Sequence, residues 1–75
     1  MNREAFLARV AEIVGVSPAE FVQNGGPLPP DLDSVVVLDI MALVDEAYGV
    51  TLSPETLTAA GSASAILDAA HAARG

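Results

Sequence analysis

The stretch that decides the fold covers residues 31–50 and reads DLDSVVVLDIMALVDEAYGV. Its apolar residues recur three, four, seven and eleven positions apart, a spacing typical of an amphipathic helix. We therefore predict a helix from Ser34 to Tyr48 that ends at Gly49, where glycine readily adopts the left-handed conformation. One continuous face of this helix is predicted to lie in the core. Its members are Val37, Ile40, Met41, Val44 and Tyr48.

Two more long helices are predicted on either side of this stretch. Apolar residues spaced by three, four and seven predict a helix over residues 3–14, with Asn2 as its N-cap and Gly15 as its end. A last helix is predicted to start after its N-cap, Ser62, and to end near residues 74–75. The apolar face of that helix is made of Ala63, Ile66, Leu67, Ala70 and Ala73.

The connections contain shorter elements. SPAE at residues 17–20 has the pattern of a capping box with proline at the first helical position, which predicts one helical turn inside the long connection of residues 15–32. The prolines of residues 25–30 exclude a helix or a central strand there. Ser53, Pro54 and Glu55 repeat the cap-and-proline pattern, and they predict a brief helix over residues 55–58 that buries Leu57.

The predicted fold class is all-α, a small up-down helical bundle of three main helices plus one short helix. The chain of 75 residues is expected to form a single domain, residues 1–75. A β-sheet domain is disfavoured, because only residues 35–38 have strand character and they lack alternation. Such a bundle offers no obvious catalytic cleft, so we expect a protein that is not an enzyme.

The chain is strongly acidic and lacks cysteine. Its ten Asp and Glu outnumber three basic residues, giving a formal net charge of −7. Nucleic-acid binding is disfavoured because phosphate contacts need clustered cations, whereas this charge favours encounter with basic protein surfaces. Alternatively, the acids keep a small apolar domain soluble. Without cysteine, neither a disulfide framework nor a thiolate metal site is available.

No targeting or membrane segment is visible in the sequence. Charged residues at positions 3, 4, 9 and 12 interrupt the N-terminal segment, which excludes a secretory signal. No uncharged apolar run approaches the roughly 20 residues that span a bilayer. We expect a cytoplasmic monomer that binds neither membrane nor nucleic acid.

Ser34 is the main candidate for chemistry. At the start of a helix, backbone N–H groups lack partners and the helix dipole is positive, so a phosphoryl group on the serine oxygen would be favourably placed. The alternative is that Ser34, or Asp33 beside it, simply caps the helix.

The residues around Ser34 predict a docking surface. Val35, Val36 and Leu38 lie off the core face, so this helix is predicted to expose an apolar collar. The acids that border the collar are Asp31, Asp33, Asp39, Asp45 and Glu46. Such a surface suits a partner with an apolar notch rimmed by Arg or Lys, although a solvated helix face would carry the same acids.

The same stretch resembles the acyl carrier protein family, whose pattern is DSL, then an apolar residue with Glu-Leu one turn later, then EE, one residue, Phe or Tyr, Gly and Val or Ile. The resemblance extends over nearly the whole chain, including the proline-bearing loop and the SASAI opening of the last helix at residues 62–66. The residues that carry it are Asp33, Ser34, Val35, Leu38, Asp39, Ile40, Ala42, Leu43, Asp45, Glu46, Tyr48, Gly49 and Val50.

This resemblance implies a non-catalytic carrier, and the length, the start Met and the end just after the last helix favour a free-standing chain over an excised module. A phosphopantetheinyl transferase would attach 4′-phosphopantetheine from coenzyme A to Ser34, and acyl groups would travel as thioesters between enzymes of fatty-acid, polyketide or related secondary-metabolite biosynthesis. Asp33 matches the acid that the family associates with the transferase complex and its magnesium ion. The residues expected to meet acyl-loading and synthase enzymes with basic docking surfaces are Val35, Val36, Leu38, Asp39, Ala42 and Glu46.

Three positions depart from the family pattern. Val35 replaces the common Leu, Val36 replaces a frequently polar residue, and Ala42 replaces a larger residue that is often Met. The recognition face is therefore expected to be more apolar near Ser34 and flatter one turn on, which we interpret as a dedicated set of partners. Two alternatives stay open: a peptidyl or aminoacyl carrier, and a carrier-fold interaction module without the arm. The Asp before the serine favours acyl cargo.

A serine hydrolase is the least supported alternative. It would need His71, the only histidine, as a base near Ser34, together with an oxyanion hole and an orienting group. Nothing in the sequence predicts that assembly. One histidine and scattered carboxylates also lack the spacing of a metal site.

Overall fold

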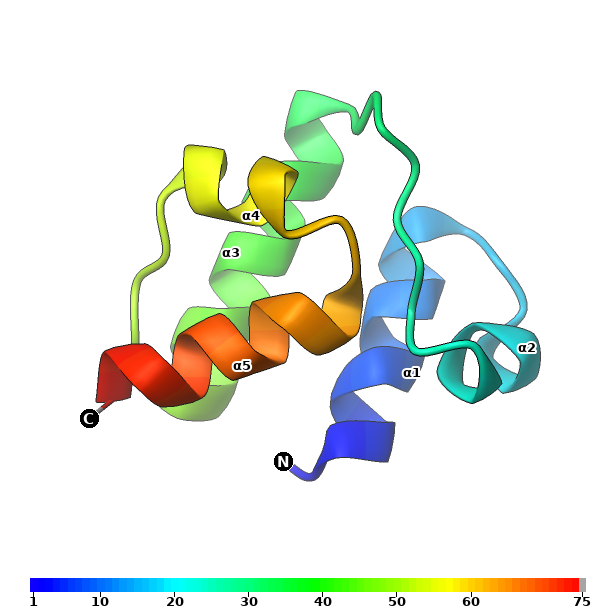
Figure 1. The fold of residues 1–75 in the computed structure, drawn as a ribbon, viewed down its shortest axis with the longest axis horizontal. Helices are drawn as coiled ribbons and strands as arrows, with labels where there is room; N and C mark the ends of the chain where they lie inside the picture. The colour runs from blue at the N-terminus through cyan, green and yellow to red at the C-terminus, as the bar shows by residue number, and fades with distance from the viewer. Residues whose placement is uncertain (75) are drawn as a thin grey trace.

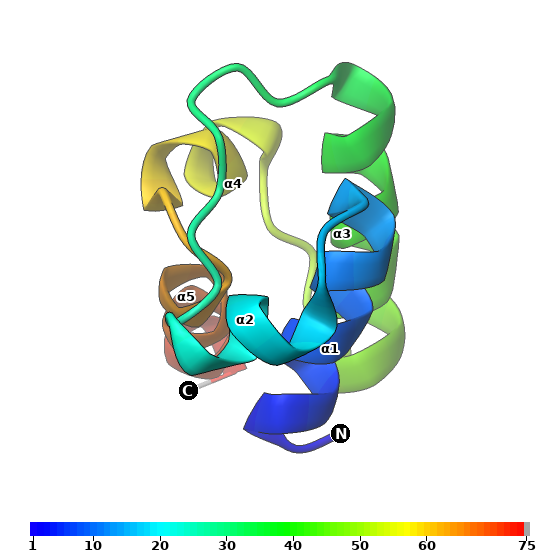
Figure 2. The same ribbon diagram turned by 90° about the vertical axis from the view of Figure 1, so that its right-hand side faces the viewer.

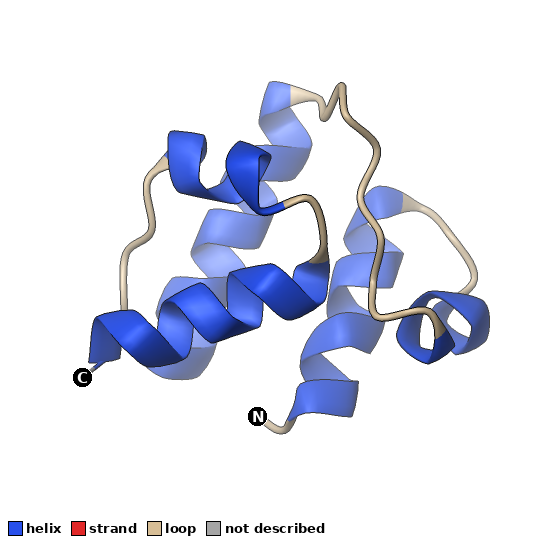
Figure 3. Cartoon of the chain, in the orientation of Figure 1, coloured by secondary structure: helices blue, strands red, loops and turns tan. Residues whose placement is uncertain are grey.

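The computed structural model describes residues 1–74, and over this range the chain forms five helices and no strand (Figures 1 and 3). The helices are α1 (Arg3–Val14), α2 (Pro18–Gln23), α3 (Ser34–Tyr48), α4 (Pro54–Ala60) and α5 (Ala63–Arg74). The predicted all-α bundle is confirmed. A second short helix, α2, replaces the single turn that the sequence predicted, and α4 is longer than predicted. The last helix was predicted to end near residues 74–75, and it ends at Arg74; residue 75 lies outside the described residues.

The three long helices surround one core. Figures 1 and 2 show α1 beside α3 and running in the opposite direction, with α5 lying across both. Helix α4 lies against α3 and α5, while α2 packs on α1. Figure 2 also shows the loop after α2 running past α4 before it reaches the start of α3. Leu32, near the end of this loop, lies with Ser34 and with Pro54 and Thr58 of α4 around one depression.

Local signals fix the ends of the long helices as predicted. Asn2 caps α1, since its Oδ1 accepts a hydrogen bond from the Ala5 N–H at 2.8 Å. Both α1 and α3 end at a glycine in the left-handed conformation, Gly15 with φ 88° and Gly49 with φ 68°. Ser62 caps the last helix through its Oγ, which accepts from the Ala65 N–H at 3.1 Å.

The core consists of sixteen buried apolar residues that come from all five helices and from Leu52. They are Phe6, Leu7, Val10, Ala11, Phe21, Val37, Ile40, Leu43, Val44, Tyr48, Leu52, Leu57, Ala63, Ile66, Leu67 and Ala70. No polar or charged residue among the described ones is buried with them. Apolar packing therefore supplies the stability of this small fold.

Two predictions about the core were wrong in detail. Leu43 is buried on α3, whereas Met41 is only partly buried, because α1 covers the Leu43 side of α3 and extends the buried face in that direction. Ala73 is exposed, because the buried face of α5 ends at Ala70 and its last turn projects beyond α3 (Figure 1).

The long loop is fastened to the junction between α4 and α5. Leu28 N donates to the Gly61 carbonyl at 3.0 Å, and the Ala63 N–H donates to the Gly26 carbonyl at 2.6 Å. Gly26 has a φ of 73°, and a Cβ there would lie 2.6 Å from the Ala63 Cβ. This position therefore requires glycine both for its backbone conformation and for the close approach.

The two short helices begin differently. Ser53 caps α4 as predicted, its Oγ accepting from the Thr56 N–H at 3.2 Å. The capping box predicted at the start of α2 does not form, because the Ser17 side chain makes no cap hydrogen bond. Burial of Phe21 holds α2 against the core, so this helix is maintained by packing and by its N-terminal proline.

Candidate functional site

Ser34 is the first residue of α3, and its side chain is exposed. Asp33, not Ser34, is the N-cap, since the Asp33 Oδ1 accepts a hydrogen bond from the Val35 N–H at 2.9 Å. None of the side-chain hydrogen bonds within residues 1–74 involves the Ser34 hydroxyl. The hydroxyl is therefore open to solvent at the positive end of the longest helix.

A groove of about 320 Å³ opens beside Ser34. Its lining combines the end of the long loop, the first turn of α3 and one side of α4, namely Leu32, Ser34, Val37, Leu38, Pro54 and Thr58. Apart from the two hydroxyl side chains, the lining is apolar. An aliphatic group attached to Ser34 would find apolar surface within reach without unfolding the core.

The predicted apolar collar is exposed at two of its three residues. Val35 is 62% exposed and Leu38 is 60% exposed, which is unusual for large apolar side chains. Val36 is partly buried and contacts the core instead. It precedes Leu43 by seven residues and so lies on the same side of α3, toward α1.

The remaining predicted partner residues lie on a different side of α3. Asp39, Ala42 and Glu46 are exposed, and they line a second groove, of about 190 Å³, together with Leu43 and two residues of α1, Arg9 and Ile13. The sequence placed all six predicted contact residues on one surface. In the structure, Leu38 lines the groove next to α4, whereas Asp39, Ala42 and Glu46 line the groove next to α1. Val35 and Val36 line neither groove.

Sequence reasoning did not identify the residues that complete the two grooves. Pro54 and Thr58 lie four residues apart on α4, and Arg9 and Ile13 lie four apart on α1, so each pair shares one side of its helix. That spacing could have shown that each pair lies on one side of its helix. The sequence did not show which helix lies beside α3 or which side of it faces α3, because both depend on the tertiary arrangement.

His71 lies at the opposite end of α3 from Ser34. Its ring packs edge-on against Tyr48, the last residue of α3, with ring centroids 5.5 Å apart. A 15-residue helix separates the two ends of α3 by about 21 Å at 1.5 Å per residue. His71 is therefore too far away to act as a base for Ser34.

Tyr48 joins both termini to the core. Its hydroxyl donates to the Met1 carbonyl oxygen at 3.0 Å, and its ring lies 5.6 Å from that of Phe6. Burial disfavours the charged phenolate and raises the pKa of Tyr48 above its usual value of 10.0. This tyrosine is a structural element rather than part of the Ser34 site.

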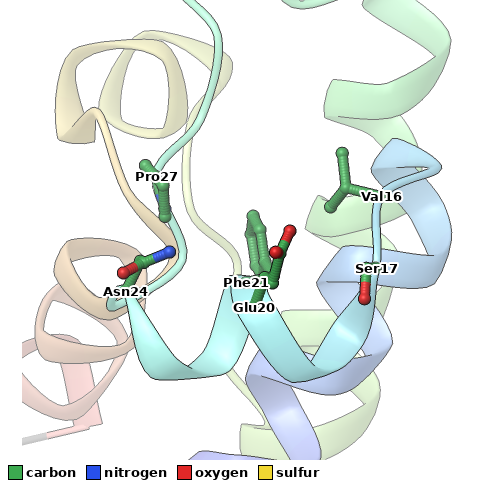
Figure 4. Close-up of a pocket in the computed structure, with 6 residues that line it drawn as sticks. All are labelled: Val16, Ser17, Glu20, Phe21, Asn24 and Pro27. Atoms are coloured by element: carbon green, nitrogen blue, oxygen red, sulfur yellow. The ribbon is translucent and has the colours of Figure 1, made fainter.

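A third depression lies on α2 and the start of the long loop (Figure 4). It is lined by Val16, Ser17, Glu20, Phe21, Asn24 and Pro27 and has a volume of about 190 Å³. Figure 4 shows the Glu20 side chain beside the Phe21 ring, with Asn24 and Pro27 across from them. Its polar groups are exposed and do not converge on one point.

The described part of the chain contains neither a cluster of metal-ligating side chains nor a helix that could span a membrane. Residues 1–74 contain no group of three or more His, Cys, Asp or Glu side chains that could hold a metal ion. Among the helices in this range, none is both long enough and apolar enough to cross a bilayer.

The fold and site therefore define a small helical bundle with an exposed serine at the start of its longest helix and a groove on each side of that helix. Compared with known proteins, the chain matches no family model, no curated protein and no solved structure.

Proposed function

We propose that this chain is an acyl carrier protein whose Ser34 receives a 4′-phosphopantetheine arm from coenzyme A. One observation carries the proposal: the Ser34 hydroxyl is exposed and unbonded at the start of α3, on the rim of an apolar groove. A serine required only for capping would use its oxygen, and here Asp33 performs that role.

The residues around Ser34 fit a phosphodiester. The first N–H groups of α3 and its dipole favour negative charge at this position. The Asp33 Oδ1 is occupied by its cap hydrogen bond, and the second carboxylate oxygen is available to a magnesium ion held by the transferase. We therefore assign Ser34 as the attachment point and Asp33 as the residue that contacts the transferase and its metal.

In the loading reaction, Ser34 Oγ attacks the phosphorus of coenzyme A that bears the pantetheine group. The new O–P bond forms as the bond to adenosine 3′,5′-bisphosphate breaks, and the hydroxyl proton passes to a base on the transferase. When bound, the arm supplies a terminal thiol that carries acyl groups as thioesters, a function that the chain itself cannot supply because it has no cysteine.

The groove beside Ser34 favours aliphatic cargo. Methylene groups of an acyl chain can contact its apolar lining residues, Leu32, Val37, Leu38 and Pro54, without burying a polar group. A charged aminoacyl group would lose its hydration there and gain no charged partner. This observation favours an acyl carrier over an aminoacyl carrier. Carriers of this kind serve fatty-acid, polyketide or related secondary-metabolite biosynthesis.

A loading assay tests the proposal directly. The chain is incubated with coenzyme A, magnesium and a broad-specificity phosphopantetheinyl transferase, and its intact mass is measured. We expect addition of one phosphopantetheinyl group to the natural chain and none to Ser34→Ala, which keeps the Asp33 cap. If a competent transferase adds nothing to the natural chain, the protein is a carrier-fold interaction module without the arm.

A second assay tests the acidic surface of α3 in loading. Asp39→Lys and Glu46→Lys should each slow loading by a transferase with a basic docking surface, because both side chains are exposed on the proposed contact side. Asp68→Lys, an exposed charge reversal on α5, serves as the matched control. All three variants should retain helical circular dichroism, and loading rates equal to that of the control would remove these residues from the interface.

A further inference from the structure

We propose that Asn24 and Gly25 form a site of spontaneous covalent modification, at which Asn24 deamidates through a succinimide and leaves aspartate or isoaspartate. The reaction needs only water, and it goes beyond the carrier function because it is independent of whether Ser34 bears an arm. The isoaspartate product weakens the contact between the long loop and the start of α5. Slow chemical ageing at this site therefore acts on the loop that leads to α3.

Asparagine, a thermolabile residue, stands directly before a glycine only at residues 24 and 25. Because glycine has no Cβ, its backbone nitrogen can approach the preceding side chain with little steric hindrance. The Asn24 side chain is exposed on the rim of the depression on α2 (Figure 4), and none of the side-chain hydrogen bonds within residues 1–74 holds its amide. A Cβ built on Gly25 would meet no atom within 4 Å. The two reacting groups therefore have open space around them.

The reaction closes a five-membered ring and then opens it. The Gly25 backbone nitrogen gives its proton to hydroxide and attacks Asn24 Cγ, so that a new C–N bond forms. The Cγ–Nδ2 bond breaks, and the departing nitrogen takes a proton from water and leaves as ammonia. Water then opens the ring by attack at either carbonyl carbon. Attack at Cγ leaves aspartate, whereas attack at the backbone carbonyl leaves isoaspartate, in which the main chain passes through Cβ and Cγ.

The folded backbone slows this reaction without preventing it. Asn24 is the C-cap of α2, and its ψ of 11° directs the Gly25 nitrogen away from the Asn24 side chain. The Gly25 N–H also donates to the Val22 carbonyl at 3.2 Å, the one backbone hydrogen bond that the peptide between residues 24 and 25 makes within residues 1–74. Ring closure requires this bond to open and the peptide to rotate. Because the bond is long and lies at the end of a six-residue helix, local opening has a low cost in free energy.

Isoaspartate would change the backbone where the loop is fastened to α5. The Gly25 carbonyl accepts from the Ser64 N–H at 3.3 Å. The Gly26 carbonyl accepts from the Ala63 N–H at 2.6 Å, and a Cβ on Gly26 would lie 2.6 Å from the Ala63 Cβ, so this position has no spare room. An extra backbone carbon just before these two carbonyls displaces them from the start of α5. Aspartate adds only a charge at an exposed position and leaves the carbonyls in place.

The test ages the purified chain at neutral pH, both folded and unfolded in urea, and follows Asn24 by mass spectrometry of proteolytic fragments. Conversion adds a negative charge to the net charge of −7, which separates the product by anion exchange. An isoaspartyl methyltransferase with labelled S-adenosylmethionine then marks the isoaspartyl fraction. We expect Asn24 to convert in both samples, about tenfold more slowly in the folded chain. Asn2, which precedes Arg3 and caps α1, should convert far more slowly than Asn24 in both.

Two variants of Asn24 serve as matched controls. Asn24→Gln disfavours the five-membered ring and should stay unconverted, whereas Asn24→Asp adds the charge without the extra backbone carbon. Both, freshly purified, should melt with the fresh natural chain. The isoaspartyl fraction should melt about 4–8 °C lower, the shift that the loss of one hydrogen bond produces in a domain of this size. Absence of conversion at Asn24 in the folded chain would overturn the proposal, as would faster conversion at another amide. An isoaspartyl fraction that melts with Asn24→Asp would overturn the effect on the α5 contact.

Discussion

Replacing Asp33 should separate the two roles assigned to it. Its Oδ1 accepts from the Val35 N–H at 2.9 Å, so Asp33→Ala removes the N-cap of α3 and leaves that donor without a protein partner. Loss of such a cap destabilises proteins by about 1 kcal/mol, within a range of about 0.5–2 kcal/mol. Asp33→Ser retains a capping oxygen and should cost only a few tenths of a kcal/mol.

Urea unfolding followed by circular dichroism measures this difference. For a domain this small, unfolding free energy falls by about 1 kcal/mol per molar urea, so Asp33→Ala should lower the midpoint by about 1 M and Asp33→Ser by much less. Asp31→Ala is the matched control, because Asp31 is an exposed acid two residues earlier that makes no side-chain hydrogen bond within residues 1–74.

The loading rate then tests the second role of Asp33. If its carboxylate contacts magnesium in the transferase complex, Asp33→Ser should fold like the natural chain and still load slowly. Equal destabilisation by Ala and Ser would refute the assignment of Asp33 as the cap. Normal loading of the Ser variant would refute the metal contact while leaving the cap intact.

Three further predictions concern the core and the loop. Ile40→Ala removes a fully buried side chain and should cost about 2–5 kcal/mol in urea unfolding, whereas Ala42→Gly on the exposed side should cost about 1 kcal/mol. Gly26→Ala should lower the melting temperature, since its Cβ would meet Ala63 at 2.6 Å; an unchanged temperature would mean that the loop relaxes freely. The raised pKa of Tyr48 means that the native state favours the neutral phenol. The contribution of this preference to the free energy of unfolding is fully present below pH 10 and is lost as pH rises through the higher native pKa. Tyr48→Phe should therefore flatten the alkaline loss of stability in a pH series of melting curves, and an unaltered slope would assign that loss to other groups.

The ends of the helices could be predicted from the sequence because local chemistry determines them. Asn2, Gly15, Gly49, Ser53 and Ser62 each act within one turn of their own position, and each has the predicted role. Ser17 is the exception. Its oxygen makes no cap hydrogen bond, because the position of α2 depends on burial of Phe21 rather than on its first turn.

The edges of the buried faces could not be predicted in the same way. Periodicity showed that α3 has a core side, but the width of that side depends on where α1 lies. This contact buries Leu43 and partly buries Val36, a residue predicted to belong to an exposed collar. Likewise, the end of the buried face of α5 depends on where its neighbours stop, which leaves Ala73 exposed.

The candidate site was predictable at its centre and not at its rim. Ser34 and the exposed positions Val35, Leu38, Asp39, Ala42 and Glu46 follow from their place on α3. The residues contributed by other elements could be found only once those elements were placed. These residues are Leu32, Pro54 and Thr58 on one side and Arg9 and Ile13 on the other.

The division of labour between Asp33 and Ser34 has a consequence for how this protein can change. Because the Asp33 side chain caps α3, the Ser34 side chain is not needed to stabilise the start of the helix. Substitutions of Ser34 can therefore be selected for their chemistry with little loss of folding stability. A lineage could therefore lose and regain a modifiable hydroxyl here by single substitutions while the bundle persists. Stability and chemical competence can evolve independently at two adjacent residues.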